Sequence, residues 1–203
     1  VEDIDGNVYK TITIGSQTWM QENLKVTKYR DGSNIENLTD EYWAITNSGA
    51  YCWYENNINN SRIYGALYNF YAVVDNRNIC PLGWRVPTIN DWEILKNYLG
   101  GHAIAGGKLK DSTNIWLCNE ELVNSVNDNS SGFTAIPGGK RDEGSSWGYN
   151  DIGWFGYWWA ISADTKSIAS SSFYVECIPA DLNRNDSFSK RKGLSVRCIK
   201  ENN

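Results

Sequence analysis

Short stretches of alternating apolar and polar positions mark the first third of the chain. Residues 7–20 alternate around three β-branched apolar residues and then turn at Gly15. A two-residue period interrupted by a glycine turn is typical of a β-hairpin. The apolar residues 50–54 predict a further short strand, and the Asp-Gly pair within residues 29–33 predicts a tight turn.

Two stretches have helical spacing instead. Residues 64–74 carry aromatic and aliphatic side chains at intervals of three and four, which predicts an amphipathic helix whose stripe packs in the core. A second helix is expected over residues 88–99, because Thr88 suits the N-cap position and Asp91 suits the third helical position. Gly100 is the expected end of this helix.

The pattern after residue 106 changes to short strands separated by polar connections. The strand candidates are residues 133–136, 154–162, 171–178 and 194–200. Residues 181–186 are uniformly polar apart from one leucine, and we interpret them as a loop. No linker, repeat or low-complexity segment divides the chain, so residues 1–203 are expected to form a single α+β domain.

Aromatic residues are the feature of the composition that changes this picture. The chain holds 10 Trp, 12 Tyr and 5 Phe, most of them rings with a polar atom. Successive strand residues face opposite sides, so Trp158 and Trp159 are not expected to be buried together in a sheet that is covered on one face only. One ring of each neighbouring pair is therefore expected to line the core, and the other to lie on an exposed face or under a loop. The polar residues 181–186 are candidate partners for a ligand on that face, or alternatively oxygen ligands for Ca²⁺.

Charge excludes several classes of function. The formal net charge is −5, which argues against nucleic acid and against acidic membranes as partners. The basic residues 190–192 are interpreted as a solvated turn. No stretch of about 18 apolar residues is present, so the chain is not expected to span a membrane. Because it begins at Val1 without a charged and apolar leader, we interpret it as a mature or trimmed form.

Catalytic and metal-binding patterns are sparse. The single histidine, His102, follows Gly100 at a helix end and is interpreted as a structural residue that caps carbonyl groups. No closely spaced cysteine or histidine pairs suggest zinc, and no metal site is predicted. Carboxylate pairs are not identifiable from spacing, although Glu176 lies in an apolar strand and is expected on its solvent face.

Five cysteines are spread widely along the chain, at positions 52, 80, 118, 177 and 198. In a sequence rich in Asn, Ser and Gly, this spacing favours extracellular disulfides with one unpaired thiol.

Nine motifs follow one another in a characteristic order. They are residues 15–20 (GSQTWM), 29–32 (YRDG), 50–54 (AYCWY), 64–69 (YGALYN), 80–88 (CPLGWRVPT), 106–110 (GGKLK), 132–139 (GFTAIPGG), 156–159 (GYWW) and 193–198 (GLSVRC). From about residue 7 to 200, this order resembles the Fibrobacter succinogenes major paralogous domain, a family of exported bacterial proteins that are often lipoproteins.

The resemblance implies a C-type lectin-like fold, with two helices packed on antiparallel β-sheets with long loops. It also implies a ligand face on the late strands and a disulfide between Cys80 and Cys198. It assigns no partner to Cys52, Cys118 or Cys177, of which Cys118 and Cys177 are guessed to pair. The Glu-Pro-Asn and Trp-Asn-Asp motifs of calcium-dependent lectins are absent, so no cofactor is expected, with a structural Ca²⁺ kept as an alternative.

These observations lead to one hypothesis and two alternatives. The hypothesis is a non-catalytic binding module, secreted or held as a lipoprotein on the outer surface of a bacterium, that recognises a glycan or a protein. Its candidate ligand-binding residues are Trp154, Tyr157, Tyr174, Asn183, Arg184, Asn185 and Asp186. The alternatives are an enzyme on the same scaffold, either carbohydrate-active or a thiol oxidase, and a structural or adhesin assembly subunit.

Overall fold

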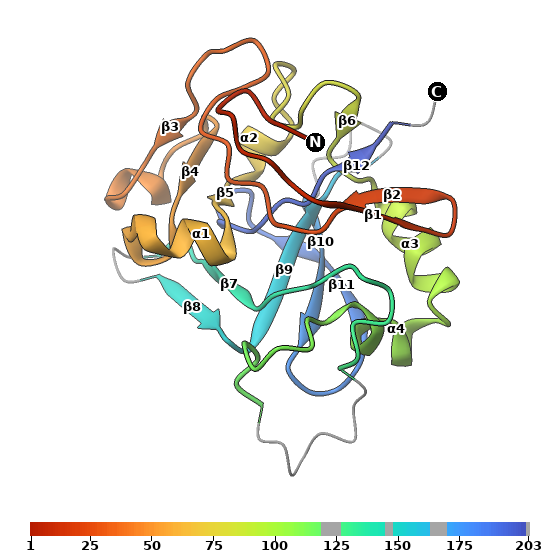
Figure 1. Cartoon of the computed structure of the whole chain (residues 1–203). Coiled ribbons are helices and arrows are strands. Elements are labelled where there is room, and N and C mark those ends of the chain that lie inside the picture. The colour runs from red at the N-terminus through yellow and green to blue at the C-terminus, as the bar shows by residue number, and fades with distance from the viewer. Residues whose placement is uncertain (119–126, 145–147, 163–169, 202–203) are drawn as a thin grey trace.

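A computed structural model describes residues 1–118, 127–144, 148–162 and 170–201. Within these ranges most of the regular structure is strand, arranged in three sheets that are joined by short helices and long irregular segments (Figure 1). The four-stranded sheet has the order β1 (Thr11–Ile14), β2 (Gln17–Met20), β12 (Ile199–Lys200) and β6 (Trp84–Arg85). The five-stranded sheet has the order β11 (Leu182–Phe188), β10 (Ser170–Glu176), β9 (Phe155–Ala160), β7 (Gly138–Arg141) and β8 (Tyr149–Ile152). The three-stranded sheet has the order β3 (Glu36–Asn37), β4 (Ala50–Cys52) and β5 (Leu67–Tyr68).

The helices are short. The α-helices are α1 (Ser61–Tyr64), α2 (Phe70–Val73), α3 (Ile89–Tyr98) and α4 (His102–Leu109), and the 3-10 helices are η1 (Glu41–Ala44), η2 (Tyr54–Asn56) and η3 (Ile58–Asn60). None of the helices in the described ranges is long and apolar enough to cross a bilayer.

The predicted α+β fold of the C-type lectin-like kind is wrong, because sheets form most of the regular structure.

Several local predictions are confirmed. Residues 7–20 contain the antiparallel pair β1–β2, and Ala50–Cys52 forms β4 within the predicted strand 50–54. Helix α3 begins after Thr88, whose side chain accepts from the backbone of Asp91 while the Asp91 carboxylate accepts from the backbone of Thr88. This reciprocal capping box satisfies two otherwise unpaired amide groups at the helix start.

The helix predicted over residues 64–74 is absent. Gly65, at φ +75°, ends α1, and β5 follows before α2 begins. Buried Asn69 starts α2, because its Oδ1 accepts from the amide of Ala72, 3.0 Å away. The prediction that the stripe packs in the core is confirmed only in part: Leu67 and Tyr68 are buried, Tyr64 and Tyr71 are half-buried, and Val74 is exposed. Local turn and capping residues override the helical spacing of this segment.

The late strands differ from their predicted lengths. β9 lies within the predicted strand 154–162, and β10 overlaps the predicted strand 171–178 but begins one residue earlier, at Ser170. Residues 133–136 form only a bridge at Ala135, and strand β7 starts at Gly138 instead. In the predicted strand 194–200, only β12 joins a ladder, whereas Leu194 and Ser195 form isolated bridges.

Trp158 and Trp159 are both fully buried, so neither ring of this pair lies on an exposed face. They point to opposite faces of β9, as strand geometry requires, but both faces are covered at this point. The Trp158 ring lies 5.9 Å from Trp92 of α3, and the Trp159 ring lies 5.2 Å from Phe70 of α2. The five-stranded sheet therefore separates two apolar clusters.

Two disulfides connect distant parts of the chain. Cys80 pairs with Cys198 and Cys118 pairs with Cys177, as expected, with Cα atoms 6.0 and 5.6 Å apart respectively. Cys52 is the remaining thiol, and its complete burial raises its pKa. Two disulfides are compatible with an extracellular protein.

Candidate functional site

Four aromatic rings lie together on one side of the five-stranded sheet. We call this group the aromatic face: Phe155 and Tyr157 of β9, Tyr174 of β10 and Phe188 of β11. Tyr157 is central, with its ring centroid 5.5 Å from Phe155, 5.7 Å from Tyr174 and 5.9 Å from Phe188. Phe155, Tyr174 and Phe188 are half-buried, while Tyr157 is only 6% exposed.

Strand alternation explains why these rings stay near the surface. Phe173 and Val175 flank Tyr174 in β10 and are fully buried on the opposite side of the sheet, in the cluster with α3. On the side of the aromatic face, Trp159 is covered by Phe70, whereas Phe155 lies farther along β9 and is only partly covered. The aromatic face is therefore the part of this side that the core leaves accessible.

A charged pair borders the aromatic face on β7 and β8. The Tyr157 hydroxyl donates to Asp151 Oδ2 over 2.9 Å, and Lys140 forms an ion pair with the same carboxylate. The Lys140 ammonium also lies 5.1 Å from the centroid of the Tyr157 ring. Burial and the neighbouring Asp151 charge raise the pKa of Tyr157, so its hydroxyl stays a hydrogen-bond donor.

A second charged pair lies at Phe188. The Lys192 ammonium is 5.3 Å from the centroid of the Phe188 ring and forms an ion pair with Asp142. Lys190 and Arg191 lie in a turn, as predicted, but residues 190–192 are half-buried and make side-chain contacts rather than being only solvated. Arg191, for example, donates to the Asn47 side chain over 2.8 Å.

A carboxylate occupies the opposite end of the aromatic face. Glu176 lies directly across from Phe155 in the β9–β10 ladder and two residues beyond Tyr174, so all three side chains share one side. Its half-buried position agrees with the predicted outward orientation. Burial raises the pKa of Glu176, and the nearby Asp181 charge raises it further.

The structure brings together three of the predicted ligand-binding residues. Tyr157 lies across from Tyr174 in β9–β10, and Asn183 lies across from Tyr174 in β10–β11. Trp154 is 48% exposed in the turn before β9, and among the described ring contacts it touches none of the aromatic face.

Residues 182–188 form the edge strand β11, so the predicted loop 181–186 is wrong. Arg184 lies across from buried Phe173 and therefore on the other side of the sheet, where its Nε donates to Asp186 over 2.7 Å. Asn185 uses its side-chain oxygen to accept from the amide of Ser187. Arg184 and Asp186 thus do not join the aromatic face.

Sequence reasoning missed Phe155, Phe188, Lys140 and Lys192 as members or neighbours of this site. Phe155 was recognisable from the sequence, because it lies two residues before Tyr157 in the same strand and therefore faces the same side. The two lysines reach the site from separate segments, and nothing in their local sequence indicates where they lie.

The predicted structural residue His102 does not cap helix α3 but begins α4. Its Nδ1 lies 2.9 Å from the carbonyl oxygen of Leu182, and its Nε2 lies 3.6 Å from Asp181. Over the part of the chain that the structure describes, no group of three or more His, Cys, Asp or Glu side chains is arranged to hold a metal ion. The oxygens of Asp186 and Asn185 considered for Ca²⁺ are used within β11.

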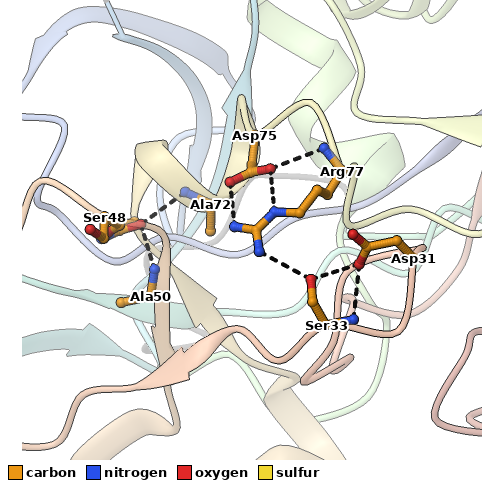
Figure 2. Close-up of polar contacts among 8 residues, drawn as sticks. Asp31, Ser33, Ser48, Ala50, Ala72, Asp75 and Arg77 are labelled. Atoms are coloured by element: carbon orange, nitrogen blue, oxygen red, sulfur yellow. Dashed lines mark hydrogen bonds and ion pairs between the residues drawn. The ribbon is translucent and has the colours of Figure 1, made fainter.

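A separate polar cluster in the first half of the chain has a structural role (Figure 2). Arg77 donates from Nε and Nη2 to the Asp75 carboxylate and from Nη1 to Ser33, which in turn donates to Asp31. The guanidinium carbon lies 3.8 Å from the centroid of the Tyr29 ring and covers it. These groups hydrogen-bond to one another and hold the predicted turn at residues 29–33.

Comparison with known proteins identifies one related family. The family model described as Fibrobacter succinogenes major domain matches residues 12–200. Neither a curated protein nor a solved structure matches the chain significantly. The C-type lectin-like arrangement implied by the sequence resemblance thus has no support from solved structures.

Proposed function

The chain belongs to the Fibrobacter succinogenes major domain family, and from this premise we propose that it is a non-catalytic ligand-binding module. The ligand is a glycan or a protein. The observation that carries the proposal is the aromatic face, a contiguous group of rings that the core leaves partly accessible.

The chemistry of the aromatic face supports binding. The half-buried rings of Phe155 and Tyr174 offer flat apolar area with little conformational entropy to lose, which suits stacking against a sugar ring or an apolar side chain. Hydrogen-bonding groups surround them: Asn183 lies across from Tyr174, and Asp151 and Glu176 lie at the two ends. Apolar area with a few fixed polar groups is typical of ligand sites.

We place this module in an exported bacterial protein, either secreted or attached to the outer surface as a lipoprotein. The support is the sequence resemblance together with the two disulfides, which persist in oxidising compartments.

Glycan and protein arrays test the proposal, with wild type compared with the Tyr157→Ala/Asn183→Ala variant. We expect wild type to bind a defined set of ligands and the double variant to lose them. Because Tyr157 is nearly buried, the single variant Asn183→Ala and a thermal unfolding curve separate lost binding from lost folding. We expect EDTA to leave binding unchanged. Unchanged affinity of a folded double variant for every ligand would place binding elsewhere.

A further inference from the structure

The aromatic face contains the same three-part arrangement twice: a ring, a carboxylate and a lysine. Lys140 lies over the ring of Tyr157 and pairs with Asp151. Lys192 lies over the ring of Phe188 and pairs with Asp142. In each case the ammonium group interacts with the negative face of the ring and with a carboxylate, two attractions that reinforce each other.

A third copy of this arrangement lacks its cation. The centroids of Phe155 and Tyr174 are 6.5 Å apart, and Glu176 lies across from Phe155 on the same side of the sheet. Among the described residues, Glu176 has no ion pair, and no basic group lies over either of these two rings. All three side chains are half-buried and therefore accessible to a partner.

Among the described residues, the basic groups near Glu176 are already used. The positive charge of Lys110 acts to lower the pKa of Glu176. The Lys110 ammonium is nevertheless buried and donates to the carbonyl oxygens of Cys177 and Pro179, 2.7 and 3.1 Å away. His102 lies beside Asp181, whose carboxylate adds to the negative charge near Glu176. No basic group of the described residues is therefore free to complete the arrangement.

We infer that the lysine or arginine side chain of a partner protein binds between Phe155, Tyr174 and Glu176. This inference rests on the proposed function and names the chemistry of its ligand. The two resident lysines show that the spacing of the aromatic face suits an aliphatic stem that ends in a cation. The net charge of −5 favours approach by a basic partner.

Fluorescence anisotropy with labelled hexalysine tests the inference in about 0.15 M salt, where long-range attraction is screened. Hexa-acetyl-lysine is the uncharged probe. Glu176→Gln removes the carboxylate, and Tyr174→Leu removes the aromatic ring while keeping an apolar side chain. The matched control is Glu36→Gln, which changes the net charge equally at an exposed position on β3, in another sheet. Thermal unfolding of each variant confirms that it folds.

We expect acetylation to abolish most binding, and Glu176→Gln and Tyr174→Leu each to weaken hexalysine binding by about threefold or more, the scale of a cation–aromatic contact. Glu36→Gln should leave the affinity nearly unchanged. Equal effects of Glu176→Gln and Glu36→Gln would overturn the inference, because binding would then reflect net charge alone. Binding that depends on Glu176 with a deacetylated chito-oligosaccharide, but not with hexalysine, would overturn the assignment to a protein partner.

The array experiment distinguishes this inference from the proposed function when Glu176→Gln is added to its set of variants. If array ligands require Tyr157 and Asn183 but not Glu176, the inference fails and the aromatic face remains the binding surface. If no ligand requires any residue of the aromatic face or Asn183, the proposed function itself fails.

Discussion

Lys110 and Arg197 are fully buried, and backbone carbonyl groups surround both charges. Lys110 donates to the carbonyls of Cys177 and Pro179, and Arg197 donates to those of Phe133 and Thr134. These carbonyls lie in irregular segments, where no sheet ladder or helix provides a donor for them. The buried cations thus stabilise the irregular connections. Sequence alone does not reveal this role, because a charged residue between strands is usually read as solvent-exposed.

The pH dependence of stability tests the role of Lys110. Burial lowers its pKa from 10.5 to about 8. Below pH 8 both the folded and the unfolded states are protonated, so the cost of burying the charge is present in full. Between about pH 8 and 10.5 the folded state releases the proton first, so the free energy of unfolding rises with pH.

Urea denaturation of wild type and Lys110→Met, at about pH 7.5 and about pH 9.5, measures this effect. The free energy of unfolding of wild type should increase relative to the variant by about 2 kcal/mol over this interval. Subtracting the free energy of unfolding of the variant from that of wild type at each pH removes the contribution of groups that titrate in both proteins, such as tyrosines. A difference that does not change with pH would show that the Lys110 pKa is not lowered.

The edge strand β11 is an element that the pattern of apolar and polar residues does not predict. Only its first and last residues, Leu182 and Phe188, are apolar, so the segment resembles a loop. An edge strand needs few apolar residues, and its exposed Arg184 and Asp186 discourage pairing with another chain. By contrast, β9 and α3 were predictable, because strong apolar periodicity and a capping box mark them directly.

Helix α4 packs tightly against the segment before β11, at Gly106. A Cβ atom at this position would lie 2.4 Å from the carbonyl oxygen of Asp181 and 2.7 Å from that of Ala180. Gly106→Ala should therefore lower the free energy of unfolding by about 2 kcal/mol or more, because backbone atoms must move. Urea denaturation measures the change. Gly144→Ala is the control, since nothing lies within 4 Å of its added Cβ, and equal effects of the two substitutions would contradict this packing.

At the scale of the whole molecule, disulfides hold together sheets whose strands are very short. Cys80 lies four residues before β6, and Cys198 lies directly before β12; each of these strands has two residues. The family resemblance correctly indicated this bond. It did not indicate the arrangement of three sheets, because motif order does not specify which faces of a sheet are covered.

Removing the Cys80–Cys198 bond tests its contribution. The double variant Cys80→Ser/Cys198→Ser releases a loop with a sequence separation of 118 residues. We expect a loss of about 4–5 kcal/mol in the free energy of unfolding, from the larger entropy of the unfolded chain. Non-reducing urea denaturation checks this value. A loss below about 1 kcal/mol would show that the sheets hold together without the bond.

Calorimetric titration of an array-identified ligand tests the central claim, that the aromatic face is the binding surface. The comparison is between Tyr174→Ala on the aromatic face and Tyr42→Ala on η1, an equally sized truncation at a site that is 60% exposed. We expect Tyr174→Ala to weaken binding by about tenfold, the effect of losing an aromatic ring from the interface, and Tyr42→Ala to leave the affinity within about twofold. Unchanged affinity of a folded Tyr174→Ala variant, or equal losses from both substitutions, would contradict the claim.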